Sequence, residues 1–187
     1  SRLELIQQDP VVLKNIKSGH FTNQVSMVCS FKPKDGSGNQ KSFAVATTHL
    51  KAKDGWEELR ENQGRYLLSY LKENYNNHPL IICGDLNADY AEPVYNAFDN
   101  SDLNLKSAYC SMTSDGKEPP YTTWKIRGKA DKKTNVCRTI DYIWYTKQGL
   151  ILKSLRNFPT DEQIGEKRLP CFSYPSDHLS LTADFAV

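Results

Sequence analysis

The segment PLIICGDLN, residues 79–87, is the most informative stretch of the chain. Ile81 and Ile82 belong to a continuous apolar run, which is typical of a strand covered on both faces. We therefore predict a strand over residues 79–84. Asp85 and Asn87 follow it directly, where the end of a strand can direct polar side chains toward a shared pocket.

Further segments around this strand are rich in Val, Ile, Tyr, Phe or Trp and are bounded by polar or glycine-containing stretches, which is the pattern of β-strands. The predicted strands cover residues 24–31, 42–49 and 139–146, with two more around 150–158 and 178–187. The connection KPKDGSGNQK (32–41) is rich in Gly, Asp and Asn. A turn of this composition favours antiparallel pairing of the strands that it joins.

Apolar and aromatic side chains recur at steps of three and four residues between Trp56 and Leu71, which predicts a helix with Asp54 as its N-terminal cap. A shorter helix over 92–98 has Pro93 in its first turn, where the missing N–H costs nothing. From residue 100 to 138 no periodicity is visible, and this pattern predicts a long irregular loop. The predicted fold is α+β with mainly antiparallel sheets, whose outer faces are covered by helices.

The composition is that of one globular domain or a large piece of one. The chain has 187 residues, 39% of them apolar, and 24 basic minus 22 acidic residues give a net charge of +2. No apolar run approaches the ~18 residues that cross a bilayer. The start SRLELIQQDP lacks the features of a signal peptide, and five cysteines without a Cys-x-x-Cys motif favour a reducing compartment. We expect a cytoplasmic or mitochondrial protein that does not bind membranes.

Asp141 lies in the otherwise apolar and aromatic segment TIDYIWYT. A carboxylate buried there without a partner would cost several kcal/mol. A histidine is the natural donor, because an ionised Asp fixes the tautomer of an imidazole ring and stabilises its protonated form. The alternative is an Asp that binds backbone N–H groups of a loop.

Other polar side chains also mark strand ends. The candidate set is His49, Asp85, Asn87, Asp141, Asp177 and His178, with Lys51 and Lys53 nearby. The chain has no Gly-x-Ser-x-Gly nucleophile motif. Carboxylates, amide, imidazole and ammonium groups suit phosphate hydrolysis, in which Mg²⁺ needs only one or two carboxylates. The segment 125–138, with six basic residues and one acidic residue, is either a substrate contact or a solvated loop.

Four motifs occur in order: THLK, CGDLNA, TIDYIWY and YPSDHLSL. Counted from His49, Asp85, Asp141 and Asp177, their separations are 85 − 49 = 36, 141 − 85 = 56 and 177 − 141 = 36 residues. In this order they resemble the endonuclease/exonuclease/phosphatase superfamily, in its deadenylase-like branch. The resemblance implies a four-layer α/β sandwich and an Mg²⁺-dependent enzyme. It also implies one of two substrates: NADP(H), which would lose its 2′-phosphate, or poly(A) RNA, which would be degraded from its 3′ end.

The resemblance further implies individual roles. Asp85 would position or deprotonate the attacking water, and Asn87 would hold a phosphate oxygen. His178, oriented by Asp141, would contact the phosphoryl group, and Asp177 would lie beside the metal, often through water. The remaining phosphate-binding residues implied are Asn23, His49, Lys51 and Lys53.

Three departures from the family pattern affect these expectations. The Gln-Glu dipeptide that carries the family's main metal ligand does not occur in the sequence, and the surroundings of Glu4 do not match it. We therefore expect residues 1–187 to be the C-terminal part of one catalytic domain, with the N-terminal half as its partner. The competing hypothesis is a binding module without activity of its own. Lys53 also replaces an arginine, which keeps the charge and loses bidentate phosphate geometry, and Leu86 replaces an aromatic residue.

Overall fold

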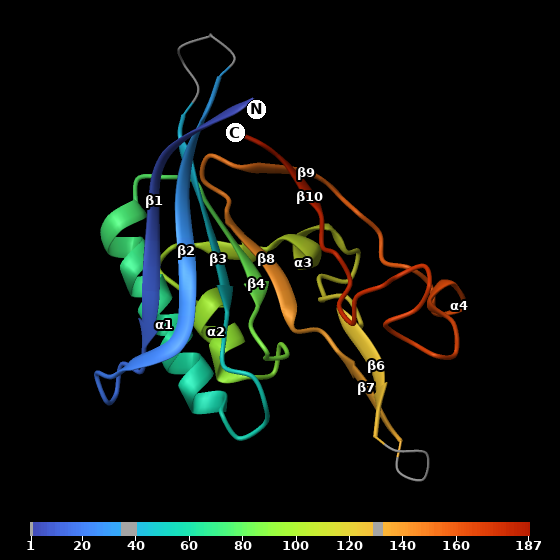
Figure 1. The fold of residues 1–187 in the computed structure, drawn as a ribbon. Helices are drawn as coiled ribbons and strands as arrows, with labels where there is room; N and C mark the ends of the chain where they lie inside the picture. Colours follow the sequence, from blue (N-terminus) through green and yellow to red (C-terminus); the bar gives the residue numbers. More distant parts are fainter. Residues whose placement is uncertain (1, 35–40, 129–132) are drawn as a thin grey trace.

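The computed structural model describes residues 2–34, 41–128 and 133–187, and its centre is a six-stranded sheet (Figure 1). The strand order is β1 (Leu3–Lys14), β2 (Phe21–Pro33), β3 (Phe43–His49), β4 (Leu80–Asp85), β8 (Asp141–Thr146) and β5 (Leu105–Ser107). Two-stranded ribbons are formed by β6 (Thr123–Arg127) with β7 (Thr134–Arg138), and by β9 (Ile151–Leu155) with β10 (Ala183–Ala186). The helices are α1 (Glu57–Tyr75), α2 (Pro93–Asp99), α3 (Ala108–Met112) and α4 (Asp161–Ile164).

Pairing in the large sheet is antiparallel except between β3 and β4, which are parallel. The exception follows from the chain order, because α1 connects these two strands and returns the chain to the same end of the sheet. The predicted α+β class with mainly antiparallel pairing is confirmed, as is the antiparallel pair β2–β3. The centre of their predicted turn, residues 35–40, lies outside the described residues.

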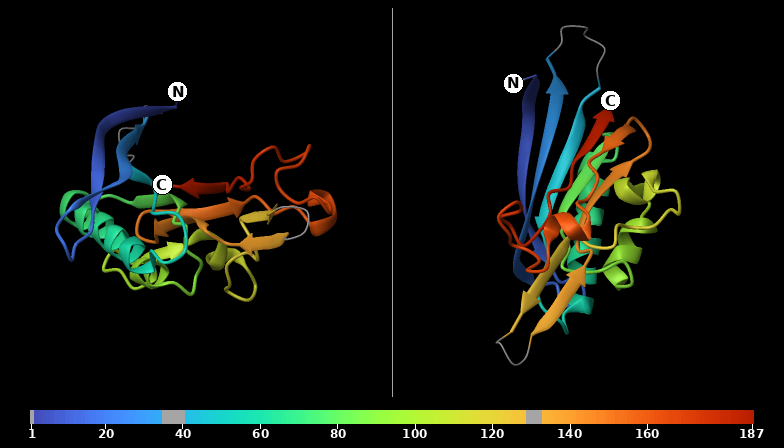
Figure 2. Two further views of the ribbon diagram at one scale, coloured as in Figure 1. Left: turned by 60° about the horizontal axis from the view of Figure 1, so that its bottom comes forward. Right: turned by 90° about the vertical axis from the view of Figure 1, so that its right-hand side faces the viewer.

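Helices α1 and α2 cover one face of the sheet (Figure 2). Side chains alternate along each strand, so Leu80 and Ile82 of β4 point into this core and pack with Leu67 and Leu71 of α1. Burying each such side chain contributes about 1.5–3 kcal/mol. The two helices approach each other closely at Gly64, where an added Cβ would lie 2.6 Å from a methyl group of Val94.

The opposite face is covered over only part of its width. Ile143 and Tyr145 of β8 pack under the β9–β10 ribbon, where the Tyr145 and Phe185 rings lie 5.2 Å apart. Among the residues that the structure describes, none covers the same face over β1 to β3. Val12 and Val25, which are register partners, are 44% and 57% exposed, and Met27 beside them is 39% exposed. We call the exposed surface of Val12, Val25 and Met27 the open face.

The structure corrects the prediction of an irregular loop over residues 100–138, which instead contains β5, α3, β6 and β7. These elements are three to five residues long, too short for periodicity to reveal. Residues 129–132 lie outside the described part of the chain. β1 was also missed, because Pro10 and a polar run interrupt its pattern. Proline is tolerated there because β1 is an edge strand.

The predicted cap of the long helix was wrong. Trp56, not Asp54, is the N-terminal boundary residue of α1, and its side chain makes no capping hydrogen bond. Instead the Glu57 carboxylate accepts a hydrogen bond from the N–H of Gly55 (3.0 Å), and backbone N–H groups lower the pKa of Glu57. No helix in the described ranges is long and apolar enough to span a bilayer.

Candidate active site

Sheet register places three candidate residues in one row. His49 of β3 is the register partner of Asp85 of β4, and Asp85 is the partner of Asp141 of β8. Paired residues of adjacent strands point to the same face, here the one opposite the helices. Gly84 makes the parallel pairing possible: its φ is +149°, and an added Cβ would lie 1.9 Å from the carbonyl oxygen of Thr48. Glycine is therefore required directly before Asp85.

His178 joins this row from the C-terminal part of the chain. Its ring Nδ1 lies 2.9 Å from one carboxylate oxygen of Asp141 and 3.2 Å from the other. This is the histidine partner that the sequence analysis expected for Asp141. The hydrogen bond to Asp141 raises the pKa of His178, against the opposing effect of burial. The contact with Asp141 therefore favours the imidazolium form of His178 relative to a free histidine.

Asp85 is surrounded by groups that act on its charge in opposite directions. Burial and the neighbouring Asp141 carboxylate raise its pKa, while the hydrogen bond from the Asn87 N–H (2.7 Å) and the nearby histidines lower it. The net effect is a raised pKa. His49 is largely exposed, with Nε2 3.5 Å from the carboxylate of Asp85. A half-buried carboxylate of this kind suits a group that takes or orients a proton of water.

Thr122 is a residue of the site that sequence reasoning missed. Its fully buried hydroxyl donates to Asp141 Oδ2 at 2.6 Å and accepts from the N–H groups of Ile140 (3.0 Å) and Asp141 (3.1 Å). The next residue, Thr123, donates to the carbonyl of Asp177 at 2.7 Å. The pair thus holds both partners of the His178–Asp141 contact. The segment EPPYTTWKIR was noticed, but the predicted loop gave no reason to place it here.

Asp177 lies beside His178 in sequence but its carboxylate points to a different partner. Lys125 Nζ lies 2.5 Å from Asp177 Oδ2, and this hydrogen bond lowers the pKa of Asp177. In the described ranges, the group of carboxylate and imidazole atoms that could share a metal consists of Asp85, Asp141 and His178, within 4.8 Å of one another. Asp177 is outside that group, so its role beside a metal, through water, stays a prediction.

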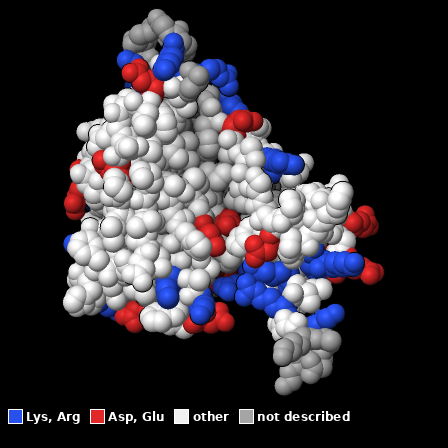
Figure 3. Space-filling model, in the orientation of Figure 1, with Lys and Arg blue, Asp and Glu red and all other residues white. Residues whose placement is uncertain are grey.

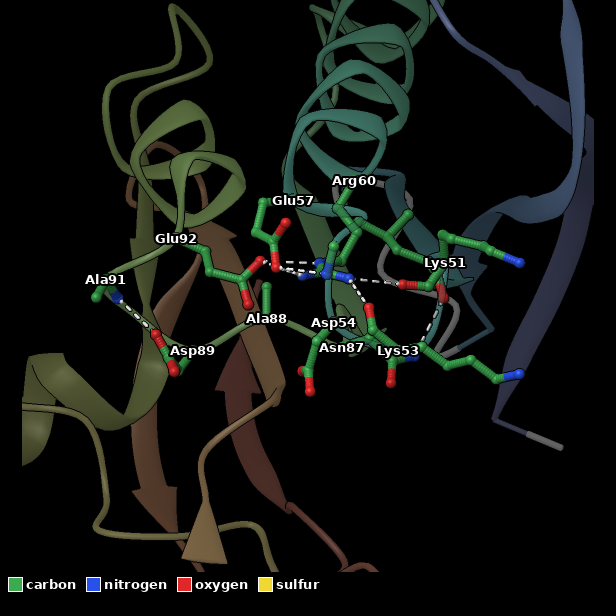
Figure 4. Close-up of polar contacts among 12 residues, drawn as sticks. Lys51, Lys53, Asp54, Glu57, Arg60, Asn87, Ala88, Asp89, Ala91 and Glu92 are labelled. Atoms are coloured by element: carbon green, nitrogen blue, oxygen red, sulfur yellow. Dashed lines mark hydrogen bonds and ion pairs between the residues drawn. The ribbon is translucent and has the colours of Figure 1, made fainter. Parts of the chain in front are cut away.

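The loop after β3 carries the two predicted lysines (Figure 4). Lys51 Nζ lies 5.1 Å from the centre of the Trp56 ring, and Lys53 is exposed with φ +80°. Asn87, at φ +51°, donates from its side chain to the carbonyl of Leu50 at 3.1 Å, which links this loop to the end of β4. Asn23 is exposed near the start of β2.

Charge is distributed unevenly around the site. Figure 3 shows acidic side chains in a hollow between the body of the large sheet and the β6–β7 ribbon, with lysine and arginine side chains gathered beside them. The ribbon contributes basic groups on both strands, including Lys125, Arg127 and Arg138. An anion that enters this hollow meets cationic groups next to carboxylates, an arrangement suited to a phosphate ester and a hard cation.

The donor set fits a hard divalent cation. Asp85 and Asp141 face each other across neighbouring strands, and their mutual repulsion contributes to the raised pKa of Asp85. A cation between carboxylate oxygens would relieve that repulsion, and Mg²⁺ needs few protein oxygens because it keeps several waters. Nδ1 of His178 is engaged with Asp141, so the carboxylates are the more suitable ligands.

The chain belongs to the endonuclease/exonuclease/phosphatase family, whose model matches residues 11–178. Within this family it is similar to nocturnin: it is 50% identical to human nocturnin over 169 residues. That match covers 88% of this chain but only 37% of human nocturnin, so the chain spans well under half the length of this relative. The structure of the human nocturnin catalytic domain with bound sulfate anion has a TM-score of 0.81 at 39% identity. The match covers 99% of this chain and 60% of that one.

A more distant relative is an exoribonuclease subunit. The Ccr4 3′-5′-exoribonuclease subunit of the CCR4-Not complex of Yarrowia lipolytica is 29% identical over 147 residues, which cover 72% of this chain and 21% of that protein. The family model and the nocturnin relatives confirm the predicted resemblance to the endonuclease/exonuclease/phosphatase superfamily.

Proposed function

We propose that the chain is the C-terminal part of a Mg²⁺-dependent phosphohydrolase that removes the 2′-phosphate from NADP(H). The observation that carries this proposal is the cluster of Asp85, Asp141 and His178, next to the lysine-bearing loop, whose Leu50 N–H donates to the carbonyl of Asp85 at 3.0 Å. The similarity to nocturnin supports it, and the sulfate anion in the human nocturnin catalytic domain indicates that the relative accepts a tetrahedral oxyanion. The choice of NADP(H) rests on the family resemblance.

The residues take roles that follow from their surroundings. Asp85, with its raised pKa, orients a water molecule and accepts its proton. His178, held by Asp141 and favoured in its cationic form, offsets the negative charge that develops on the phosphoryl oxygens. The groups that bind phosphate are Asn23, His49, Lys51, Lys53 and Asn87. Bound Mg²⁺, held by carboxylate oxygens, would polarise the phosphoryl group.

Two observations support the proposal that residues 1–187 work within a longer domain. The chain aligns with 60% of the human nocturnin catalytic domain, and its open face exposes valine and methionine side chains on a sheet. An apolar sheet face of this kind is usually covered by another layer. In this proposal the covering part also supplies the glutamate that the family uses as its main metal ligand.

The test measures phosphate release from NADPH by the full-length protein in the presence of Mg²⁺, with Asp85→Ala as the inactive control. We expect release that disappears in this variant and on removal of Mg²⁺ by EDTA. Release equal to that of the Asp85→Ala variant would exclude the proposal. Efficient turnover by residues 1–187 alone would instead contradict the need for the other part of the domain.

A second candidate function, 3′-5′ degradation of poly(A), is supported by the similarity to the Ccr4 exoribonuclease subunit and by the basic β6–β7 ribbon. Basic groups beside a site can bind the phosphate backbone of RNA as well as a dinucleotide. Shortening of a labelled A-tract by protein that leaves NADPH intact would favour it. A protein that binds NADP(H) without turning over either substrate would support the third hypothesis, a binding module.

A further inference from the structure

Arg60 on α1 is a charged side chain with unusually complete burial. It is 1% exposed, although it lies on a helix that packs against an apolar core. A guanidinium removed from water is costly unless its charge and its N–H groups are satisfied. The hydrogen-bond partners of Arg60 therefore indicate why this side chain is buried.

Arg60 forms an ion pair with Glu57 on its own helix at 3.4 Å, and its other side-chain contacts go to connections that leave the strands of the candidate site. Arg60 Nη1 donates to the backbone carbonyls of Lys51 (3.1 Å) and Lys53 (2.8 Å), in the connection after β3. Nε and Nη2 donate to Glu92 Oε2 at 2.8 and 2.6 Å, in the connection after β4. Figure 4 shows the guanidinium between these two segments. One side chain thus ties together the segments that follow His49 and Asp85.

The network reaches the third strand end as well. The second carboxylate oxygen of Glu92 accepts from Arg138 Nη2 at 3.2 Å. Arg138 ends β7, three residues before Asp141 begins β8. Arg60, Glu92 and Arg138 therefore form a continuous chain of charged contacts along the edge where the candidate residues emerge.

The backbone conformation of Lys53 indicates what this network stabilises. Its φ of +80° lies in a region that side-chain-bearing residues rarely adopt, and such a conformation persists only where surrounding contacts impose it. The carbonyl of Lys53 accepts a hydrogen bond from the Arg60 guanidinium. In Figure 4 the ammonium ends of Lys51 and Lys53 lie on the same side, away from the guanidinium. Releasing the carbonyl would remove the restraint on where the Lys53 ammonium lies.

We propose that Arg60 is a positioning residue for phosphate recognition: through the carbonyl of Lys53 it fixes the loop so that the Lys53 ammonium group faces the phosphate. This inference rests on the proposed function insofar as the substrate carries a phosphate. Arg60 touches no reacting atom in this account. It acts through Lys53, so its effect should depend on Lys53 being present.

The test is a double-mutant cycle in the full-length protein with Arg60→Lys, Lys53→Met and the double variant. Arg60→Lys keeps the charge but cannot reach Glu92 and two carbonyls at once. We expect each single variant to raise KM for NADPH about 10-fold with kcat changed less than 2-fold, and the double variant to match Lys53→Met alone. Arg65→Lys, on the same helix in an exposed pair with Glu61, is the matched control and should leave KM unchanged.

Other outcomes would overturn the inference. Full multiplication of the two single effects in the double variant would show that Arg60 does not act through Lys53. A lowered unfolding temperature with unchanged KM would show a purely structural ion pair. If Arg60→Lys does not fold, Glu92→Gln, which keeps the acceptor oxygen and removes the charge, takes its place in the cycle with the same expectations.

A phosphate-binding measurement distinguishes failure of this inference from failure of the proposed function. The dissociation constant of inorganic phosphate is measured for the same variants in the presence of Mg²⁺. If the wild-type protein binds phosphate but hydrolyses no NADPH, the proposed substrate fails and this cycle alone decides: equal, non-multiplying losses of affinity support positioning. Multiplying losses, or no phosphate binding by the wild-type protein, overturn it.

Discussion

At the scale of single residues, Asp85 carries its charge at a position that lowers the stability of the folded protein, which the proposed reaction would explain. Burial and the facing Asp141 carboxylate raise its pKa, so ionised Asp85 destabilises the folded state. We expect Asp85→Asn to lower phosphate release at least 100-fold and to leave stability unchanged or raise it by about 0.5–2 kcal/mol. Urea unfolding and a phosphate-release assay check both parts. A clear loss of stability would contradict this account of Asp85.

The contact between His178 and Asp141 predicts a specific dependence on pH. The Asp141 hydrogen bond raises the pKa of His178 above its ordinary value of 6.5. A raised folded-state pKa stabilises the protein fully below about pH 6.5, and this contribution is lost as the pH rises through the folded-state value. The difference in unfolding free energy between wild type and Asp141→Asn should therefore be largest near pH 6 and shrink toward pH 9.

NMR titration tests the same contact directly. The ring C–H signal of His178, assigned with a His178→Asn variant, should titrate above pH 6.5 in the wild-type protein and at a lower pH in Asp141→Asn. The ring signal of His20, which lies outside the site and is exposed, serves as the internal reference. An unchanged titration of His178 in Asp141→Asn would contradict the assigned cause of the shift.

Thr122 offers a third prediction at this scale. Replacing it by valine preserves the shape but leaves two backbone N–H groups, those of Ile140 and Asp141, without their acceptor. Because the position is fully buried, the loss should be about 1–3 kcal/mol in urea unfolding, with a fall in phosphate release as Asp141 loses its orientation. Thr122→Ser keeps the hydroxyl and should retain most of both properties. Equal behaviour of the two variants would contradict a role for the hydroxyl.

At the scale of elements, sequence patterns were informative where an element is long or buried on both faces. β4, β8 and α1 were predicted because their apolar positions repeat over six or more residues. The ribbon β6–β7 and strand β5 were missed because five or fewer residues carry no decisive period, and only pairing with a distant segment makes them strands. The same limit hid Thr122.

The candidate site was predictable in composition but not in geometry. The motifs indicated Asp85, Asp141 and His178, and the apolar setting of Asp141 indicated that it needs a donor. The contact of Asp177 with Lys125 could not be foreseen, because it depends on β6 lying beside the C-terminal segment. The network of Arg60 was equally hidden, since an arginine in a helix is usually exposed.

Packing between α1 and α2 gives a prediction for the helical layer. Gly64→Ala would gain about 1 kcal/mol of helix propensity, but its Cβ would lie 2.6 Å from a methyl group of Val94, whose rotamer is restricted in a helix. Overpacking costs about 1–3 kcal/mol, so we expect a net loss of stability. In a Val94→Ala background the same substitution should cost less or be neutral, because the obstructing methyl is gone. Equal losses in both backgrounds, measured by urea unfolding, would contradict this packing.

At the scale of the whole molecule, the two faces of the large sheet differ in cover. One face carries α1 and α2 over the sheet, while in the described part of the chain the β9–β10 ribbon covers only β4 and β8 on the other face (Figure 2). The candidate residues His49, Asp85 and Asp141 lie on this second face, in a row that runs from β3 to β8. The site is therefore bounded on one side by the chain itself and on the other by the open face.

This unequal cover can be tested with neighbouring residues of β2 that point in opposite directions. Val25 is exposed on the open face, whereas Val28 is fully buried against the helices. In residues 1–187 alone, Val25→Thr should change the unfolding free energy by less than about 0.5 kcal/mol and reduce binding of the dye ANS, because it removes exposed apolar surface. Val28→Thr, the matched control, should cost about 1–3 kcal/mol because it buries a hydroxyl.

In the full-length protein we expect Val25→Thr to become destabilising, since another layer then covers it. A cost for Val25→Thr that is the same in both forms of the protein would mean that nothing further packs on the open face, and the site would then be complete within this chain.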